Sequence, residues 1–308
     1  MTLSFHPLTV ADREAVQAVT LHAGRRNCSY TFANLVGWQF WFHTEVCVIP
    51  PPPAGTPPML GGELDGIVVL RFNLDGGRAY MVCTAGELPG TLIEALMEDS
   101  GENLILLGLE DNQAAALSIF NFQFSISIEP LRNQYDYIYR RADLAALKGG
   151  MLKAKRNHVN RFRAEHPHFE YRMLSPTLFD ECRRVTAIWQ EEKEASETIA
   201  TERRVMEAVF AHWEELGMLG GSIFVDGSMV AFTYGAAVTT DTFDICVEKA
   251  DRNIEGAFSI INQQFAEHLP EQYIYLNREE DMGLPGLRKA KLSYHPEILL
   301  TYNALHIT

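Results

Sequence analysis

The sequence has few features of a secreted or membrane-spanning protein. No apolar run approaches the roughly 20 residues that a helix needs to cross a bilayer. The opening residues, MTLSFHPLTVADRE, lack a basic stretch followed by an apolar one, so we expect no signal peptide. The five cysteines form no CxxC pair and no zinc-ligand spacing. Scattered thiols are typical of a reducing compartment, and we therefore expect a cytoplasmic protein.

Several common catalytic signatures are also missing. The chain contains no GxSxG nucleophile elbow, no GxxxxGK[ST] phosphate loop, no GxGxxG fingerprint and no HExxH zinc motif. His158, His166 and His168 share a polar segment, but no cysteine or second acidic ligand follows at a usable spacing. The sequence therefore gives no support to these four classes of enzyme, and we predict no metal site.

Basic residues are the scarcer charge. Lysine and arginine number 26 against 40 acidic residues, which gives a net charge of −14. This balance argues against general nucleic-acid binding, which needs a broad positive surface. Six of the 26 nevertheless fall between Leu144 and Ala164, a segment without any acidic residue. A local patch that meets one polyanionic ligand is therefore compatible with the composition.

The basic segment has the period of a helix with two faces. Leu152, Val159 and Phe162 fall on one face, and the opposite face is polar. Arginine forks and amide side chains suit phosphate or carboxylate, so this face predicts a donor phosphate site. The residues assigned to it are Lys153, Arg156, Asn157, Asn160 and Arg161. The alternative is the solvated face of a linker helix.

The length of 308 residues suggests about two domains at ~150 residues each. Both halves show antiparallel strands followed by helix, strand, helix and strand, so we predict a duplicated α/β fold. Each half is expected to be a mixed, mainly antiparallel sheet flanked by helices. We place the domains at residues 1–142 and 143–308, with a basic helix at 151–163 opening the second.

Two further segments place polar residues between a strand and a helix. A predicted strand ends at Leu276 and is followed by five polar residues, 277–281, and then by a helix start around Pro285. Amides at that start, together with Arg288, Lys289 and Lys291, predict phosphate binding. A salt-bridged helix cap is the alternative. The segment 248–257 likewise follows a strand and leads into a helix.

Three segments together resemble one bacterial family. They are LKAKRNHVNRF at 152–162, VEKADRNIEGAFSIINQQFA at 247–266 and YLNREEDMGLPGLRKAKLSYHP at 275–296. The family is similar to the C-terminal domain of phosphatidylglycerol lysyltransferase. The resemblance implies two tandem GNAT-like (acyl-CoA N-acyltransferase) domains, as in the peptidoglycan-bridge aminoacyltransferases. Such relatives move an aminoacyl group from aminoacyl-tRNA to an amine or hydroxyl.

We therefore predict transfer of an acyl or aminoacyl group from a phosphate-bearing donor to an amine or hydroxyl acceptor. Glu248 and Glu280 are the candidate bases, and Tyr294 is the candidate donor to the leaving group. Asn253 is assigned to donor phosphate binding and Asn277 to substrate binding. We expect no covalently bound cofactor; aminoacyl-tRNA or acyl-CoA would be a co-substrate, and a small-molecule or peptide amine the acceptor.

The donor is left open between these two classes. Acetyl-CoA-dependent members carry a QxxGxG/A-like loop, and the nearest match here, from Arg252 to Ala257, has one residue more between Arg and Gly. Two other hypotheses stand beside transfer. One is a non-catalytic GNAT-like module that binds a nucleotide or anionic metabolite. The other is an interaction subunit whose aromatic residues form an oligomer interface.

Overall fold

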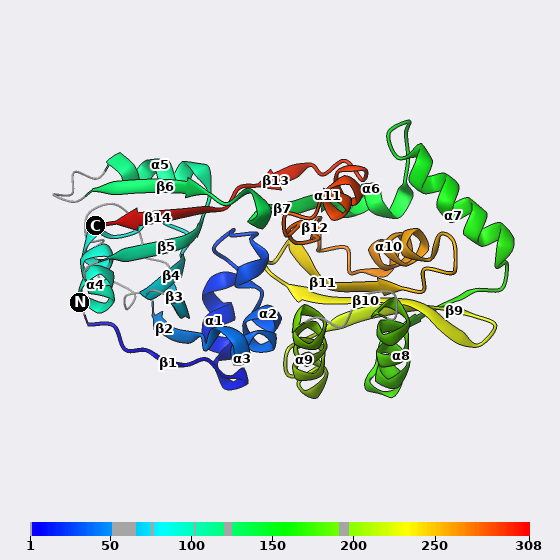
Figure 1. Cartoon of the computed structure of the whole chain (residues 1–308), viewed down its shortest axis with the longest axis horizontal. Coiled ribbons are helices and arrows are strands. Elements are labelled where there is room, and N and C mark those ends of the chain that lie inside the picture. Colours follow the sequence, from blue (N-terminus) through cyan, green and yellow to red (C-terminus); the bar gives the residue numbers. More distant parts are fainter. Residues whose placement is uncertain (1, 51–65, 75–76, 102, 120–124, 191–196) are drawn as a thin grey trace.

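The structure, a computed structural model, describes residues 2–50, 66–74, 77–101, 103–119, 125–190 and 197–308. Two β-sheets lie side by side along the long axis of the molecule, with helices packed against them (Figure 1). No helix in these ranges is long and apolar enough to span a bilayer.

The first sheet is built mainly by the N-terminal half. Four antiparallel strands are followed by one parallel step, from β4 to β5, and then by two further antiparallel neighbours. In spatial order the strands are β1 (His6–Pro7), β2 (Glu45–Ile49), β3 (Ile67–Leu74), β4 (Gly77–Cys83), β5 (Leu104–Leu109), β14 (Asn303–Ile307) and β6 (Ile126–Pro130).

The second sheet repeats this pattern. Its parallel step is from β11 to β12, and its other neighbours are antiparallel. In spatial order the strands are β8 (Glu170–Met173), β9 (Leu219–Val225), β10 (Ser228–Ala237), β11 (Thr242–Ala250), β12 (Tyr275–Asn277), β7 (Asp136–Arg140) and β13 (Ile298–Leu300).

The two halves exchange their last strands. β7 closes the N-terminal half in sequence but pairs with β12 and β13 of the second sheet. β14 closes the C-terminal half but pairs with β5 and β6 of the first. The chain therefore crosses from one sheet to the other twice here, between β6 and β7 and between β13 and β14. The domain boundary at residues 142/143 stays a prediction.

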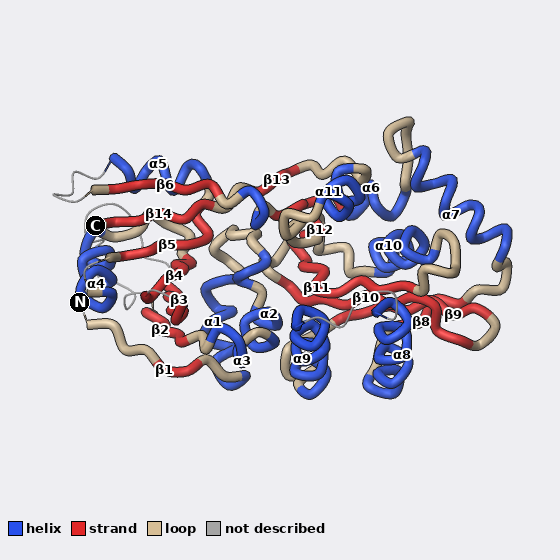
Figure 2. The backbone as a smooth tube through the Cα atoms, in the orientation of Figure 1, coloured by secondary structure: helices blue, strands red, loops and turns tan. Residues whose placement is uncertain are grey.

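Apolar side chains form three cores between the layers. The largest lies between the two sheets, because alternate residues of β3, such as Val68 and Leu70, and Phe232 and Tyr234 of β10 belong to it. The helices of this layer are α1 (Arg13–Thr20), α2 (Phe32–Gly37), α3 (Gln39–Phe42), α8 (Phe179–Gln190) and α9 (Glu197–Ala211). Figure 2 shows them between and below the sheets.

The outer cores cover the remaining faces. On the first sheet, α4 (Gly90–Ser100) and α5 (Asp111–Ile119) pack against Ile67 and Val69, the other face of β3. The outer layer of the second sheet contains α6 (Arg141–Ala146), α7 (Lys153–Glu165), α10 (Ala257–His268) and α11 (Pro285–Leu292). Val159 and Phe162 of α7 are buried here, as the helical period predicts.

A β-bulge in β11 determines which side chains reach which face. The pairing of Tyr234 with Val247 changes to Ala236 with Asp244, so β11 has one extra residue opposite Gly235. An extra residue reverses the facing of all that follow. Asp244 accordingly bonds to the layer of α2, whereas Glu248 bonds to α10.

Replacing Gly235 with alanine should disturb this bulge. A Cβ there would lie 1.7 Å from the carbonyl oxygen of Asp244, so one of the two strands must move. We expect Gly235→Ala to lower the free energy of unfolding by about 1–3 kcal/mol in urea denaturation. Gly90→Ala is the control, because a Cβ there meets nothing within 4 Å. Equal stability of the two variants would contradict the tight fit.

Candidate active site

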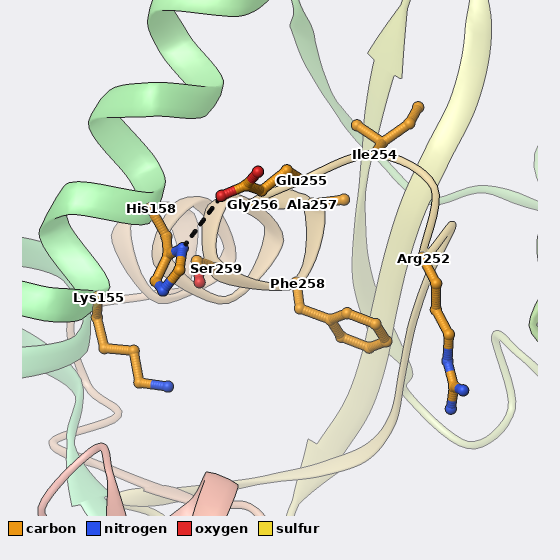
Figure 3. Close-up of a pocket in the computed structure, with 9 residues that line it drawn as sticks. All are labelled: Lys155, His158, Arg252, Ile254, Glu255, Gly256, Ala257, Phe258 and Ser259. Carbon is orange, nitrogen blue, oxygen red and sulfur yellow. Dashed lines mark ion pairs between the residues drawn. The ribbon is translucent and has the colours of Figure 1, made fainter.

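A pocket of about 310 Å³ lies where β11 leads into α10. It is lined by two residues of α7, the connecting loop and the first turn of α10: Lys155, His158, Arg252, Ile254, Glu255, Gly256, Ala257, Phe258 and Ser259 (Figure 3). Gly256 permits the close packing, since it has a φ of 85° and a Cβ there would lie 2.8 Å from the His158 carbonyl oxygen.

The pocket has the chemistry of an anion site. The amides of Phe258 and Ser259 precede the first i→i−4 bond of α10, which the amide of Ile260 donates to Gly256. Such amides, together with the helix dipole, favour negative charge. Lys155 and Arg252 extend on either side of Phe258 (Figure 3). A phosphate is therefore the ligand group that these residues suit best.

A second group of side chains begins where β11 and β12 separate. The two strands pair only over Thr242–Asp244 and Tyr275–Asn277. Beyond that point Arg278 reaches across, and its Nη2 donates to Glu248 Oε1 at 2.9 Å. The amide of Asn262, on α10, donates to the other Glu248 oxygen at 3.1 Å. Glu248 and Arg278 thus form a nearly buried ion pair.

Tyr294 joins this group to the pocket. Its ring centroid lies 4.8 Å from Arg278 Cζ and 4.1 Å from the Lys155 ammonium, and Lys155 lines the pocket. Burial raises the pKa of Tyr294, so its hydroxyl keeps its proton and can donate it. Burial and the Arg278 charge lower the pKa of Lys155. Two of the three predicted catalytic residues, Glu248 and Tyr294, are therefore neighbours.

Two buried polar atoms of this group have no partner in the described part of the chain. They are Arg278 Nη1 and Asn262 Oδ1. A buried polar atom without a hydrogen bond costs roughly 1–3 kcal/mol, so such atoms normally face a ligand or water. Arg278 Nη1 can donate a hydrogen bond and Asn262 Oδ1 can accept one. A polar ligand could therefore use both atoms.

The opposite face of the second sheet contains four clustered carboxyl groups: Asp136, Asp244, Glu279 and Glu280. Burial raises the pKa of Asp244 and of Glu279 well above its ordinary value. Burial and the Glu280 charge raise the pKa of Asp136 to about 6. Glu280, the third predicted catalytic residue, therefore lies away from Glu248 and Tyr294.

Asn277 and Lys291 hold the loop that carries these acids. The Asn277 amide donates to Asp136 Oδ2 and to the Arg26 carbonyl, while its oxygen accepts the Glu279 amide at 2.7 Å. The buried Lys291 ammonium donates to the main-chain oxygens of Arg278 and Glu280. Glu279 has a φ of 57°, a conformation that is strained for a non-glycine residue and often marks a functional position.

None of the nine predicted phosphate ligands lines the pocket beside α10. On α7, Arg156 donates to the carbonyls of Leu147 and Gly149, and Arg161 pairs with Glu165 and Glu255. Three polar residues are exposed and do not line the pocket: Lys153, Asn157 and Asn160. Asn253 donates to Asp251 in its own loop. Their role in donor binding stays a prediction.

On α11, Arg288 is engaged by a buried acid. Its Nε and Nη2 donate to the two oxygens of Asp281 at 2.7 and 2.9 Å. The Asp281 side chain is 0% exposed and also accepts from Arg132 and Tyr137. Arg288 and Lys289 line a separate hollow of about 500 Å³ on α11. The contacts of Arg288 are therefore those of the alternative named for this segment, a salt-bridged helix cap.

Asp281→Asn should weaken the fold rather than donor binding. The Arg288 hydrogen bonds hold the pKa of Asp281 well below its ordinary value, so its contribution is present above about pH 4 and lost as the pH falls further. We expect a loss of about 2–3 kcal/mol in urea unfolding at pH 7. Asp180→Asn is the control, because Asp180 also pairs with an arginine but is 96% exposed. A variant as stable as the wild type would contradict this role.

Comparison with known proteins identifies the family of this chain. The sequence profile of the family described as "Phosphatidylglycerol lysyltransferase, C-terminal" matches residues 65–305. The chain belongs to this family. Membership of this family supports a general assignment of the protein as a transferase of the aminoacyltransferase type. No protein with a curated description matches the sequence.

Solved structures similar to this family member agree with the fold. A conserved protein of unknown function from Bacteroides thetaiotaomicron VPI-5482 is 37% identical over 100% of both chains, with a TM-score of 0.90. L-PGS from Bacillus licheniformis is 13% identical over 97% of this chain and 92% of its own, with a TM-score of 0.61. FemX is 7% identical over 98% and 97%, also with a TM-score of 0.61. The predicted architecture of two mixed, mainly antiparallel sheets flanked by helices is confirmed, and FemX shares this fold.

Four residues of this family member's site were not assigned from the sequence: Lys155, His158, Arg252 and Arg278. Lys155 and His158 are three positions apart, so they share a helix face adjacent to the one that was chosen. The apolar stripe alone does not say which polar flank meets α10. Arg278 directly follows β12, in the third segment of the family resemblance. This position at the end of a strand was the one signal in the sequence that could have identified it.

Proposed function

We propose that this protein transfers an aminoacyl or acyl group from a phosphate-bearing donor to an amine or hydroxyl acceptor. The observation that carries the proposal is the contact between the basic pocket and the Glu248–Arg278–Tyr294 group, in which Arg278 Nη1 has no partner among the described residues. The family name and the FemX-like fold support the same class of reaction.

In this proposal the donor phosphate lies at the start of α10. Lys155, Arg252 and the first amides of the helix would hold it. The acyl group then extends past Tyr294 toward the separation of β11 and β12. Because the loop departs from the usual acetyl-CoA pattern and the family is named for a lysyltransferase, we favour aminoacyl-tRNA over acyl-CoA.

The chemical step assigns one role to each side chain. The acceptor amine attacks the acyl carbonyl carbon, and Glu248 takes the amine proton. The carbonyl oxygen becomes an oxyanion, which Arg278 Nη1 stabilises by donating a hydrogen bond. The bond from the acyl carbon to the donor's ester oxygen or thioester sulfur then breaks. Tyr294 donates its proton to that leaving atom and regains one, by way of solvent, from Glu248.

The test is a transfer assay with both donor classes. Purified protein is incubated with aminoacyl-tRNA or acyl-CoA and a panel of small amines, and the discharged donor and the acylated amine are quantified. We expect both products to form in equal amounts with one donor class. Donor discharge no faster than the uncatalysed rate, with every donor and amine, would contradict the proposal and favour a binding module.

A further inference from the structure

The acidic face of the second sheet contains a compact set of potential metal ligands. Asp244, Cys246 and Glu279 each offer one atom, and the three atoms lie within 4.8 Å of one another. Asp244 and Cys246 are two residues apart in β11, so ordinary strand alternation places them on the same face, and the Cys246 thiol donates to Asp244 Oδ2. Glu279 is brought to them by its left-handed backbone and the Asn277 bond.

Two polar residues of the N-terminal half, Thr31 and Asn34, donate hydrogen bonds to the carboxylates of Asp244 and Glu279. Thr31 Oγ1 donates to Asp244 Oδ2 at 2.7 Å. The Asn34 amide nitrogen donates to the same oxygen at 3.0 Å and to Glu279 Oε1 at 2.9 Å. Hydrogen bonds that orient a ligating carboxylate in this way are typical of metal sites.

One oxygen of this set is left without a partner. Asp244 is 0% exposed, and its Oδ1 has no hydrogen bond among the described residues. A buried carboxylate oxygen is costly to leave unpaired, so a bound cation at this oxygen would stabilise the site. The nearest buried ammonium, Lys291, is directed instead at the carbonyls of Arg278 and Glu280.

We propose that Asp244, Cys246 and Glu279 bind a divalent transition-metal ion of the zinc type. One thiolate with two carboxylates is a donor set for such an ion, and three protein ligands leave a coordination position open. Two carboxylates could also bind the ammonium group of a ligand. The Cys246 thiol favours a metal ion instead, since sulfur adds little to ammonium recognition. Cys246 and Glu279 are only partly buried, which gives an ion access.

The neighbouring set of Cys28, Asp136 and Glu280 is less suited. There the Asp136 oxygens accept from the Cys28 amide, the Cys28 thiol and the Asn277 amide. Neither set follows a linear metal motif, because Glu279 is remote in sequence from Asp244 and Cys246, and the three residues of the other set are remote from one another. This is why the sequence analysis predicted no metal site.

The experiment titrates the metal-stripped full-length protein with cobalt(II), a coloured substitute for zinc. We expect one equivalent to bind and to produce a thiolate-to-cobalt charge-transfer band, which zinc(II) then removes by competition. Cys246→Ser should abolish the band, while Cys28→Ser should retain it. Asn34→Ala, which removes only the orienting amide, should weaken metal affinity about 10- to 100-fold.

Three outcomes would overturn the site: no saturable cobalt binding by the wild type, a band retained in Cys246→Ser, or a band lost in Cys28→Ser alone. Stabilisation by alkylamines but not by metal would instead assign the face to an ammonium ligand. Circular dichroism checks the fold of each variant; if Cys246→Ser does not fold, Asn34→Ala decides, and unchanged affinity there overturns the site. These readouts do not depend on transferase activity.

Discussion

Replacing Glu248 with glutamine is expected to lower kcat for transfer by about 10²- to 10⁴-fold, the usual contribution of a general base. The amide is nearly isosteric and still accepts the Arg278 hydrogen bond, but it cannot take a proton from the acceptor. Donor affinity should stay close to that of the wild type, because Glu248 does not line the pocket proposed to hold the phosphate. Single-turnover transfer and equilibrium binding of the deacylated donor measure the two effects separately.

Glu202→Gln is the matched control for this variant. Glu202 pairs with Lys249, the next residue of β11, at 2.8 Å, but from α9 on the opposite face of the sheet. It should leave kcat unchanged within about twofold, since it removes an ion pair of the same strand outside the proposed site. A Glu248→Gln variant that retains full turnover would assign the base to another group.

Replacing Lys155 with alanine is expected to raise the donor Kd by about 10- to 100-fold. A charge-assisted hydrogen bond to phosphate contributes about 1.5–3 kcal/mol, and the half-buried position of Lys155 reduces its screening by water. At saturating donor, kcat should change little, because in this proposal Arg278 and Tyr294, rather than Lys155, meet the acyl group. Binding titrations at two salt concentrations should show a weaker salt dependence in the variant.

Lys148→Ala tests whether the loss of one positive charge near α7 is enough. Lys148 is exposed, precedes the same helix and does not line the pocket. We expect its donor Kd to match the wild type within about twofold. Equal weakening in both variants would indicate a diffuse electrostatic effect and would contradict a specific phosphate site at the start of α10.

Much of the architecture could be predicted because local patterns determine it. Val159 and Phe162 are buried as the helical period of the basic segment indicates. The order of strands and helices in each half, and the family resemblance of three segments, led to tandem GNAT-like sheets. The swap of β7 and β14 was not predictable, because short apolar strands do not specify which of two sheets they join.

The site was only partly accessible from the sequence, for two physical reasons. Glu248 and Glu280 were grouped as bases, yet the bulge opposite Gly235 sends Glu248 to the α10 face while Glu280 lies on the other. A single inserted residue in a strand leaves little trace in composition. Arg288 was assigned to phosphate from its helix position, whereas its partner Asp281 is fixed by tertiary contacts with Tyr137 and Arg132.

We propose that one continuous site holds the donor phosphate at α10 and the acyl group at Arg278. A crystal structure with a non-hydrolysable, amide-linked aminoacyl-adenosine phosphate would show whether both ends of the donor bind there. We predict the phosphate within hydrogen-bonding distance of Lys155 and the first amides of α10, and the acyl oxygen at Arg278 Nη1. A ligand bound instead along Lys153, Asn157 and Asn160, or in the hollow beside Lys289, would contradict the account.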